Sequence, residues 1–195
     1  VEERTKELHH QATHDSLTGL PNQTVLFKRI ENALTEAKTK GIPVGIAFLS
    51  INQMELFINA FGYKIWNQII HEIAKRLYYH FESQSTITNC TYSIIITRRD
   101  EFAIIINPLY SEAEIDKVKA LHSILEKPVV IDGNEIKLNA SIGVSIYPEH
   151  GQDPRSLLMN ADAAMLQGRR EFAAGDTELV RGLPKQNALL FCVFA

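Results

Sequence analysis

Apolar residues recur at helical spacing in several stretches of the chain. One apolar face, within residues 22–40, is formed by Phe27, Ile30, Leu34 and Ala37. Another, within residues 65–81, is formed by Ile65, Ile69, Ile73, Leu77 and Phe81. Residues three and four apart share one side of a helix, so both stretches predict amphipathic helices. Residues 111–127 show the same pattern and end at Pro128. A last helix is predicted at residues 153–171, with Asp153 as its N-cap.

Short apolar runs between these helices predict buried strands. The first is "VGIAFLSI" at residues 44–51, and "YSIIIT" and "EFAIII" follow at residues 92–97 and 101–106. Residues 128–147 predict a hairpin, because Asp-Gly at positions 132 and 133 is a strong signal for a tight turn. Helices therefore alternate with a mostly antiparallel sheet, which indicates an α+β fold with helices packed on the sheet.

The two ends of the chain differ from this pattern. Residues 1–13 are charged and contain neither glycine nor proline, which predicts a linker helix arriving from an upstream domain, or alternatively a frayed terminus. Residues 14–172 would then form the folded domain. The tail, residues 173–195, shows no clear period before its last eight residues, so we expect either an edge strand or non-native sequence there.

Composition narrows the class of protein. Hydrophobic residues make up 45% of the 195 residues, enough for a sizeable core. The net charge of −3 argues against a generally basic, nucleic-acid-binding surface. Cys90 and Cys192 stand far apart and are expected to be reduced. No apolar run approaches the ~20 residues of a membrane span. We therefore expect a soluble, cytoplasmic domain without membrane insertion, which a longer membrane-bound receptor could also carry.

Three segments, in this order and spacing, resemble the GGDEF family, the diguanylate cyclase domain of bacteria. They are "HDSLTGLPN" at residues 14–22, "DEFAIII" at 100–106 and "ASIGVSIYPEHGQDPRSLLMNADAAM" at 140–165. The resemblance implies a nucleotidyl-cyclase-like fold with a central five-stranded sheet, related to the palm of polymerases. Active members of the family join two GTP molecules into cyclic di-GMP in a homodimer, with two Mg²⁺ ions in each site.

The first strand departs from the family's pattern. The family motif resembles FLDxDxFKxINDxxGHxxGD, and residues 48–67 align to it as "FLSINQMELFINAFGYKIWN". The metal-binding aspartate is replaced by Ser50 and the guanine-reading asparagine by Ile58. The other motif positions that differ are Asn52, Met54, Glu55, Asn59, Tyr63, Trp66 and Asn67. A neutral hydroxyl is a poor ligand for Mg²⁺, and an apolar side chain cannot hydrogen-bond guanine. The resemblance therefore implies a degenerate, catalytically silent member.

The hairpin between the second and third strands also departs from the family. Arg98 and Arg99 stand where the family has two glycines, and arginine at a positive φ costs on the order of 1 kcal/mol. Asp100 matches the family's metal-binding acid and Glu101 the acid beside it. We favour charge neutralisation on an exposed turn, with Asp100 and Glu101 beside the arginines. Residual metal or nucleotide binding is the alternative, and a third interpretation makes the arginines an anion site or a regulatory contact with a partner domain.

Other positions complete a residual nucleotide site. Arg169 corresponds to the family's phosphate-binding lysine and keeps its charge. The backbone amides near Gln53 and Met54 would contact phosphates, beside Asp100 and Glu101. The inhibitory product site of the family, an Arg-x-x-Asp, falls at Asn89 and Tyr92 and is therefore absent.

The resemblance to the family, together with these replacements, implies a regulatory module without catalysis. It would relay a signal between a sensor and an EAL-type effector of the same chain. The alternatives are a GTP-binding sensor without turnover and a weakly active diguanylate cyclase. We expect no cofactor, and Mg²⁺ only if nucleotide binding remains. A second copy of the chain and GTP are further expected partners. His10 and His14 have metal-compatible spacing, but exposed linker histidines are the expected state.

Overall fold

Two sheets and five helices lie within the part of the chain that the computed structural model describes. The residues that it describes are 2–85, 90–109, 118, 120–125, 127–174, 183–185 and 188–193. The helices are α1 (Glu2–Thr13), α2 (Gln23–Lys40), α3 (Met54–Ser85), α5 (Leu121–Leu125) and α6 (Pro154–Ala173). The strands are β1 (Val44–Ile51), β2 (Thr91–Arg98), β3 (Glu101–Asn107), β4 (Val129–Ile131), β5 (Asn134–Ile136), β6 (Ala140–Tyr147), β7 (Leu183–Lys185) and β8 (Ala188–Val193).

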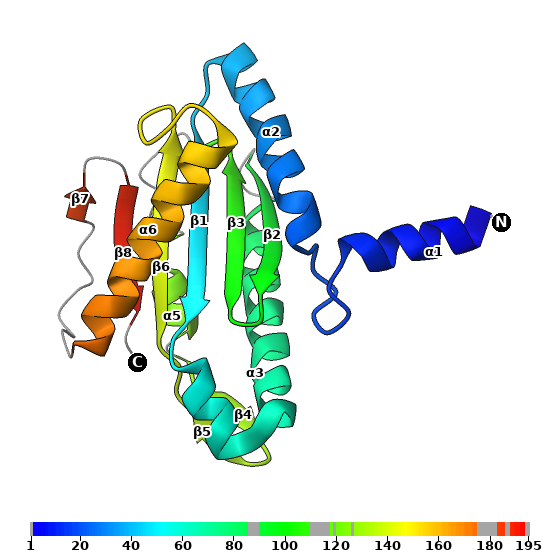
Figure 1. Ribbon diagram of the computed structural model, residues 1–195, viewed down its shortest axis with the longest axis vertical. Coiled ribbons are helices and arrows are strands. Elements are labelled where there is room, and N and C mark those ends of the chain that lie inside the picture. The colour runs from blue at the N-terminus through cyan, green and yellow to red at the C-terminus, as the bar shows by residue number, and fades with distance from the viewer. Residues whose placement is uncertain are drawn as a thin grey trace.

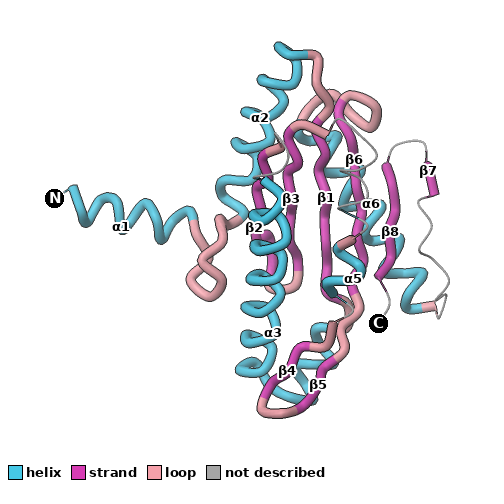
Figure 2. The backbone as a smooth tube through the Cα atoms, turned by 180° about the vertical axis from the view of Figure 1, so that it is seen from behind, coloured by secondary structure: helices cyan, strands magenta, loops and turns pink. Residues whose placement is uncertain are grey.

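The main sheet confirms the α+β class. Its strands follow the order β2-β3-β1-β6-β8-β7 and every pair is antiparallel (Figure 1). Helices α2 and α6 lie on one face of this sheet and α3 on the other, as the two opposite views show (Figures 1 and 2). Each face therefore has its own hydrophobic core. One core gathers the apolar residues of α3, and the other those of α2 and α6.

Strand β1 supplies both cores because alternate side chains point to opposite faces. Val44, Ile46 and Phe48 pack toward α2 and α6, whereas Ala47, Leu49 and Ile51 pack toward α3. All eight residues of β1 are buried, as expected for a central strand between two layers of helices. The continuous apolar run of this strand is thus explained by its position.

The main sheet has six strands among the described residues and not the expected five, because two strands of the tail join the four strands β2, β3, β1 and β6. Strand β8 pairs with β6 from Ala140 to Val144, and β7 pairs with β8 and forms the edge of the sheet. Without β8, the outer backbone groups of β6 would remain unpaired. The last apolar residues therefore form an inner strand of this sheet and not its edge.

The predicted hairpin at residues 128–147 is wrong in its extent. Only β4 and β5 form a hairpin, a separate two-stranded sheet whose turn has positive φ at Asp132 (50°) and Gly133 (81°). Two successive left-handed residues are typical of tight hairpin turns. Strand β6 leaves this hairpin and pairs with β1 along its whole length. A tight turn fixes only its nearest pairs, so the sequence signal does not extend to residue 147.

Helix α3 is longer than predicted. It starts at Met54, and Gly62 interrupts it with φ 80° and ψ 166°. Glycine permits this left-handed backbone at little cost, so the chain changes direction there. The part before Gly62 contributes only partly buried residues to the core, among them Met54, Phe57 and Ile58, so its apolar pattern is weaker than that of residues 65–81. Of the helix predicted at 111–127, the structure shows Leu121–Leu125, and much of the rest lies outside the described residues.

Helix α6 crosses β6 at very short range. A Cβ atom built on Gly143 of β6 would stand 2.1 Å from the Ala161 carbonyl oxygen and 2.3 Å from the Met165 nitrogen. Only glycine fits this contact. Asp153 caps α6 as predicted, by accepting hydrogen bonds from the Arg155 and Ser156 amides. The close crossing holds the end of α6 near the end of β1.

Helix α1 projects away from the body of the domain (Figure 1). Its end is fastened to α2, because the Ala12 carbonyl accepts from Asn22 Nδ2 at 3.0 Å and from Thr24 Oγ1 at 3.1 Å. Residues 2–13 are thus helical, and their role as a linker from an upstream domain stays a prediction. Among the described residues, no helix combines the length and the apolar character that crossing a bilayer requires.

Candidate functional site

The turn between β2 and β3 divides its four charges between two sides. Arg98 and Arg99 are exposed, whereas Asp100 and Glu101 are only 6% and 5% accessible. The expectation of four neutralised charges on an exposed turn is therefore wrong for the acids. They are buried because the turn lies against β1: Glu101 stands opposite Ser50, and the Ile51 amide donates to the Asp100 carbonyl at 2.8 Å.

The arginines do not strain this turn. Among the described non-glycine residues, only Gln53 and Asp132 have a positive φ, so the expected left-handed arginine is wrong. The pairing of β2 with β3 shifts its register between Ile96 and Arg98. Such an irregularity twists the strand locally and re-aims its side chains. The chain reverses here without the backbone conformation that would require glycine.

On the buried side, Arg169 holds Asp100. Arg169 Nη2 lies 3.6 Å from Asp100 Oδ2, and Arg169 Nη1 donates to Ser50 Oγ at 3.4 Å. Burial raises the pKa of Asp100, and the nearby charges of Arg169 and Arg98 oppose this effect only in part. The Ser50 side chain is the last of several causes that act to lower the pKa of the Asp100 carboxyl. One guanidinium thus joins the end of β1 to the turn.

Glu101 has a weaker partner. Its Oε1 atom lies 3.5 Å from Arg98 Nη1, and the Arg98 side chain is 73% exposed. Burial raises the pKa of Glu101, Arg98 opposes the rise, and the charges of Asp100 and Asp162 add to it. An exposed partner compensates a buried carboxylate poorly, because water screens the pair.

The end of β1 leads directly into α3. The Asn52 amide donates to the Asn139 carbonyl at 2.7 Å, and Asn52 Oδ1 accepts from Ser141 Oγ at 3.2 Å. Asn52 Nδ2 is buried and finds no partner among the described groups. Gln53 then takes a left-handed turn with φ 63°, and α3 begins at Met54. The predicted backbone amides therefore lie at the start of a helix, one turn beyond Ser50.

The structure brings together most of the predicted site residues, but they do not fit magnesium. Ser50, Asp100, Glu101 and Arg169 meet between β1, the turn and α6. Mg²⁺ requires several oxygen ligands with negative charge. Asp100 is instead paired with a cation, and Ser50 is neutral. Within the described ranges, no group of three or more His, Cys, Asp or Glu side chains is arranged to hold a metal ion, and this includes His10 and His14.

Sequence reasoning missed the role of Trp66. This side chain is 2% accessible, and its Nε1 atom donates to the Arg99 carbonyl at 3.3 Å. It also packs against Phe57, with ring centroids 6.1 Å apart. On the outer side, the Arg99 guanidinium lies 5.6 Å from the centroid of the Tyr63 ring. The sequence contained one signal for this role, since Trp66 and Arg99 both replace glycines of the family motif. The structure shows that these two residues are in contact.

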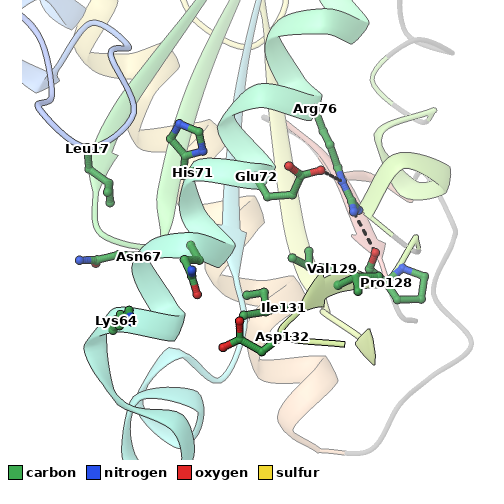
Figure 3. A pocket seen from close by; sticks show the side chains of 12 residues that line it. Leu17, Lys64, Asn67, His71, Glu72, Arg76, Pro128, Val129, Ile131 and Asp132 are labelled. Atoms are coloured by element: carbon green, nitrogen blue, oxygen red, sulfur yellow. Dashed lines mark hydrogen bonds and ion pairs between the residues drawn. The ribbon is translucent and has the colours of Figure 1, made fainter. Parts of the chain in front are cut away.

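Several hollows lie beside α3, and two of them lie close to the turn or to the β4–β5 hairpin. One, of about 570 Å³, lies beside Arg98, Arg99, Tyr63 and Trp66. The other, of about 690 Å³, lies between α3 and the β4–β5 hairpin (Figure 3). Arg76 crosses the second hollow from Glu72, at 3.0 Å, to the Pro128 carbonyl, at 2.8 Å. That arginine therefore ties α3 to β4, whereas the arginines of the first hollow are exposed.

Fold and site together define a cyclase-like α+β domain. A solved structure of TpbB (YfiN) from Pseudomonas aeruginosa, comprising only the GGDEF domain, matches with a TM-score of 0.74 at 26% identity, over 81% of this chain and 89% of that one. The family model "Diguanylate cyclase, GGDEF domain" matches residues 12–173. The chain therefore belongs to the GGDEF family.

Two curated relatives are longer than this chain. MucR of Pseudomonas aeruginosa, a bifunctional diguanylate cyclase/cyclic di-GMP phosphodiesterase, is 28% identical over 189 residues, which cover 95% of this chain and 27% of MucR. Diguanylate cyclase TpbB of the same species is 27% identical over 173 residues, which cover 88% of this chain and 38% of TpbB. The chain thus spans well under half of either relative.

Proposed function

We propose that this GGDEF domain is a regulatory module of cyclic di-GMP signalling that does not itself make cyclic di-GMP. The observation that carries the proposal is the contact of Arg169 with both Asp100 and Ser50. A guanidinium lies between the two positions that would have to face a metal ion. The domain would therefore act through its contacts with neighbouring domains.

The chemistry of the family explains why this contact matters. Joining two GTP molecules requires loss of a proton from a 3′-hydroxyl and neutralisation of the charge on the leaving pyrophosphate. Arginine stays protonated in proteins and has no acceptor atom, so it cannot take that proton. It supplies positive charge, but it offers the hydroxyl no coordination position. Arg169 therefore replaces only the charge of a metal ion.

The position that would read guanine supports the same proposal. Ile58 is partly buried and packs against the core on the α3 side of the sheet. A site that reads a base through hydrogen bonds discriminates strongly, and an apolar replacement removes that discrimination. GTP would lose both its metal and its base contact. Weak cyclase activity and GTP sensing without turnover are therefore the less favoured functions.

The relay role follows from the same features. Helix α1 projects from the domain beside α2, where it could transmit a displacement to the loop at residues 14–22. The relatives MucR and TpbB extend well beyond the matched segment. A domain without its own reaction would then couple an upstream sensor to a downstream effector of the EAL type.

A turnover and binding assay tests this proposal. The chain is incubated with GTP and Mg²⁺, cyclic di-GMP is measured by chromatography, and GTP binding is measured by calorimetry. We expect neither product nor binding heat. Binding without product would support the GTP sensor instead, and product formation would overturn the proposal. The variant S50D/I58N/R98G/R99G is the matched positive probe, since it restores the metal ligand, the base reader and the glycines.

A further inference from the structure

We propose that the exposed side of the turn is a docking surface for an acidic polypeptide segment of a partner protein. We call it the arginine surface and define it by Phe61, Tyr63, Arg98 and Arg99. The inference rests on the proposed function, since it names the kind of partner through which a silent domain would act. It uses the exposed side of the turn, which Arg98 and Arg99 occupy.

The arginine surface offers positive charge that the domain itself uses only in part, through the pair of Arg98 with Glu101. Arg98 has one ion pair, at 3.5 Å to Glu101, with a side chain that is 73% exposed. Within the described part of the chain, no carboxylate lies at ion-pair distance from Arg99. Guanidinium groups bind carboxylates through two parallel hydrogen bonds. Arg98 and Arg99 can therefore each bind a carboxylate of a partner by donating hydrogen bonds to it.

Apart from Asp15, the residues that line the hollow beside the arginines are neutral or apolar. The hollow of about 570 Å³ beside the arginines is lined by neutral polar residues, including Gln23, Thr24 and Thr97. Asp15 is the acid among its lining residues, and its Oδ1 atom accepts from the amides of residues 17 and 18, at 3.2 and 2.8 Å. The hollow is thus positively charged on a chain whose net charge is −3. This charge selects an acidic partner.

Exposed aromatic rings favour a polypeptide over a small anion. Phe61 and Tyr63 are 55% and 58% exposed, and they flank Gly62. Tyr63 lies against Arg99 itself. Phe57 links Phe61 to Trp66, since its ring lies 6.2 Å from Phe61 and 6.1 Å from Trp66. Aromatic residues and arginine are enriched in protein–protein interfaces. A peptide would cover these rings, whereas a phosphate or nucleotide bound by the arginines would leave Phe61 in water.

The backbone of the turn is already fixed for binding. Trp66 Nε1 holds the Arg99 carbonyl, and the Ile51 amide holds the Asp100 carbonyl. The Tyr63 ring also lies under the Arg99 guanidinium at 5.6 Å. A surface held in its bound shape loses less entropy on association. The arginines are thus presented by a rigid turn.

Fluorescence anisotropy on the whole chain tests the docking surface. The probe is a fluorescein-labelled peptide in which glutamate and aspartate flank one phenylalanine. The variant R98Q/R99Q is compared with R4Q/R155Q, which removes the same charge from exposed positions elsewhere. We expect R98Q/R99Q to bind about tenfold more weakly, as loss of charge-assisted bonds predicts, and R4Q/R155Q to bind like the parent. A peptide with glutamine and asparagine at the acidic positions should not bind.

Several outcomes would overturn the inference. Absence of peptide binding would do so, and so would an equal loss in the two double variants, which would show unspecific charge attraction. Full displacement of the peptide by equimolar GTP or inorganic phosphate would indicate a small-anion site. Self-association of the parent that R98Q/R99Q abolishes, seen in sedimentation, would indicate a second copy as the occupant. Peptide binding does not require turnover of GTP. If the chain produces cyclic di-GMP and still binds the peptide, only the proposed function is overturned, and the docking surface stands.

Discussion

Arginine side chains have different roles on the buried and exposed sides of the turn between β2 and β3. On the buried side, Asp100 and Glu101 are almost inaccessible, and Arg169 comes from α6 to compensate Asp100. On the exposed side, Arg98 and Arg99 face solvent, with partners that water screens. A buried charge without a partner costs much, whereas an exposed one costs little. The buried side is therefore constrained by stability, and the exposed side is free for binding.

The largest loss of stability is expected at Trp66, because this side chain lies in the core and also holds the backbone of the turn. Trp66→Ala should cost about 3–5 kcal/mol of unfolding free energy, because it leaves a large cavity in the core beneath the turn. Urea denaturation measures this loss. Trp66→Phe is the matched variant, since it keeps much of the packing and loses the bond to the Arg99 carbonyl; it should cost about 1 kcal/mol. Equal costs for the two variants would contradict the packing role.

Removing Arg169 should have the next largest effect. Arg169→Ala leaves Asp100 buried without its cation and should cost about 1–3 kcal/mol, less than a fully buried pair because Arg169 is 38% exposed. Asp100→Asn in the same background should recover most of this loss in a double-mutant cycle. The neighbouring exposed Arg170→Ala is the control and should change stability little. Additive losses would show that Arg169 and Asp100 are not coupled.

The stability that depends on the buried side of the turn should change with pH because of Glu101. Burial raises its pKa in the folded state above the ordinary value of about 4. The folded protein therefore binds more protons than the unfolded chain, and stability falls as the pH rises from about 4 through the folded-state pKa. Glu101→Gln cannot ionise, so it should unfold at a higher urea concentration than the parent at pH 7. The difference should shrink toward pH 4, and a pH-independent difference would contradict this account.

The smallest effect is expected on the exposed side. Arg98→Ala and Arg99→Ala should each change the unfolding free energy by no more than about 0.5 kcal/mol, as for other exposed charges. Thermal denaturation with circular dichroism checks this at low and high salt. A large loss at either position would place these arginines among the residues that hold the fold. The sharp contrast between the two sides would then disappear.

The fold could largely be predicted from the sequence because its signals are local. The apolar run of β1, the Asp153 cap and most of the helical face of α2 each depend on neighbouring residues. The prediction that Phe27 lies on that face is wrong, because Phe27 is 49% exposed and Leu26 is buried beside Ile30. The pairing of β8 with β6 and the departure of β6 from the β4–β5 hairpin depend on contacts between distant strands. Such contacts leave no pattern in a short window.

The site could be predicted in its membership but not in its geometry. Ser50, Asp100 and Arg169 stand at positions that the family motif marks, so alignment alone gathered them. Turns are usually exposed, so the sequence predicted exposed acids. The burial of Asp100 and Glu101 depends on how closely the turn lies against β1, which the motif does not show. The sequence also could not show which group the Arg169 side chain binds, because this long side chain can reach either a phosphate or a carboxylate.

The most direct test of the central claim is a manganese titration followed by electron paramagnetic resonance. Mn²⁺ is added to the parent chain with and without GTP, and to R169A/S50D, which removes the internal cation and restores the carboxylate of β1. We expect no protein-bound Mn²⁺ in the parent and a bound ion in the double variant. Stoichiometric Mn²⁺ on the parent in the presence of GTP, lost in Asp100→Asn, would contradict it.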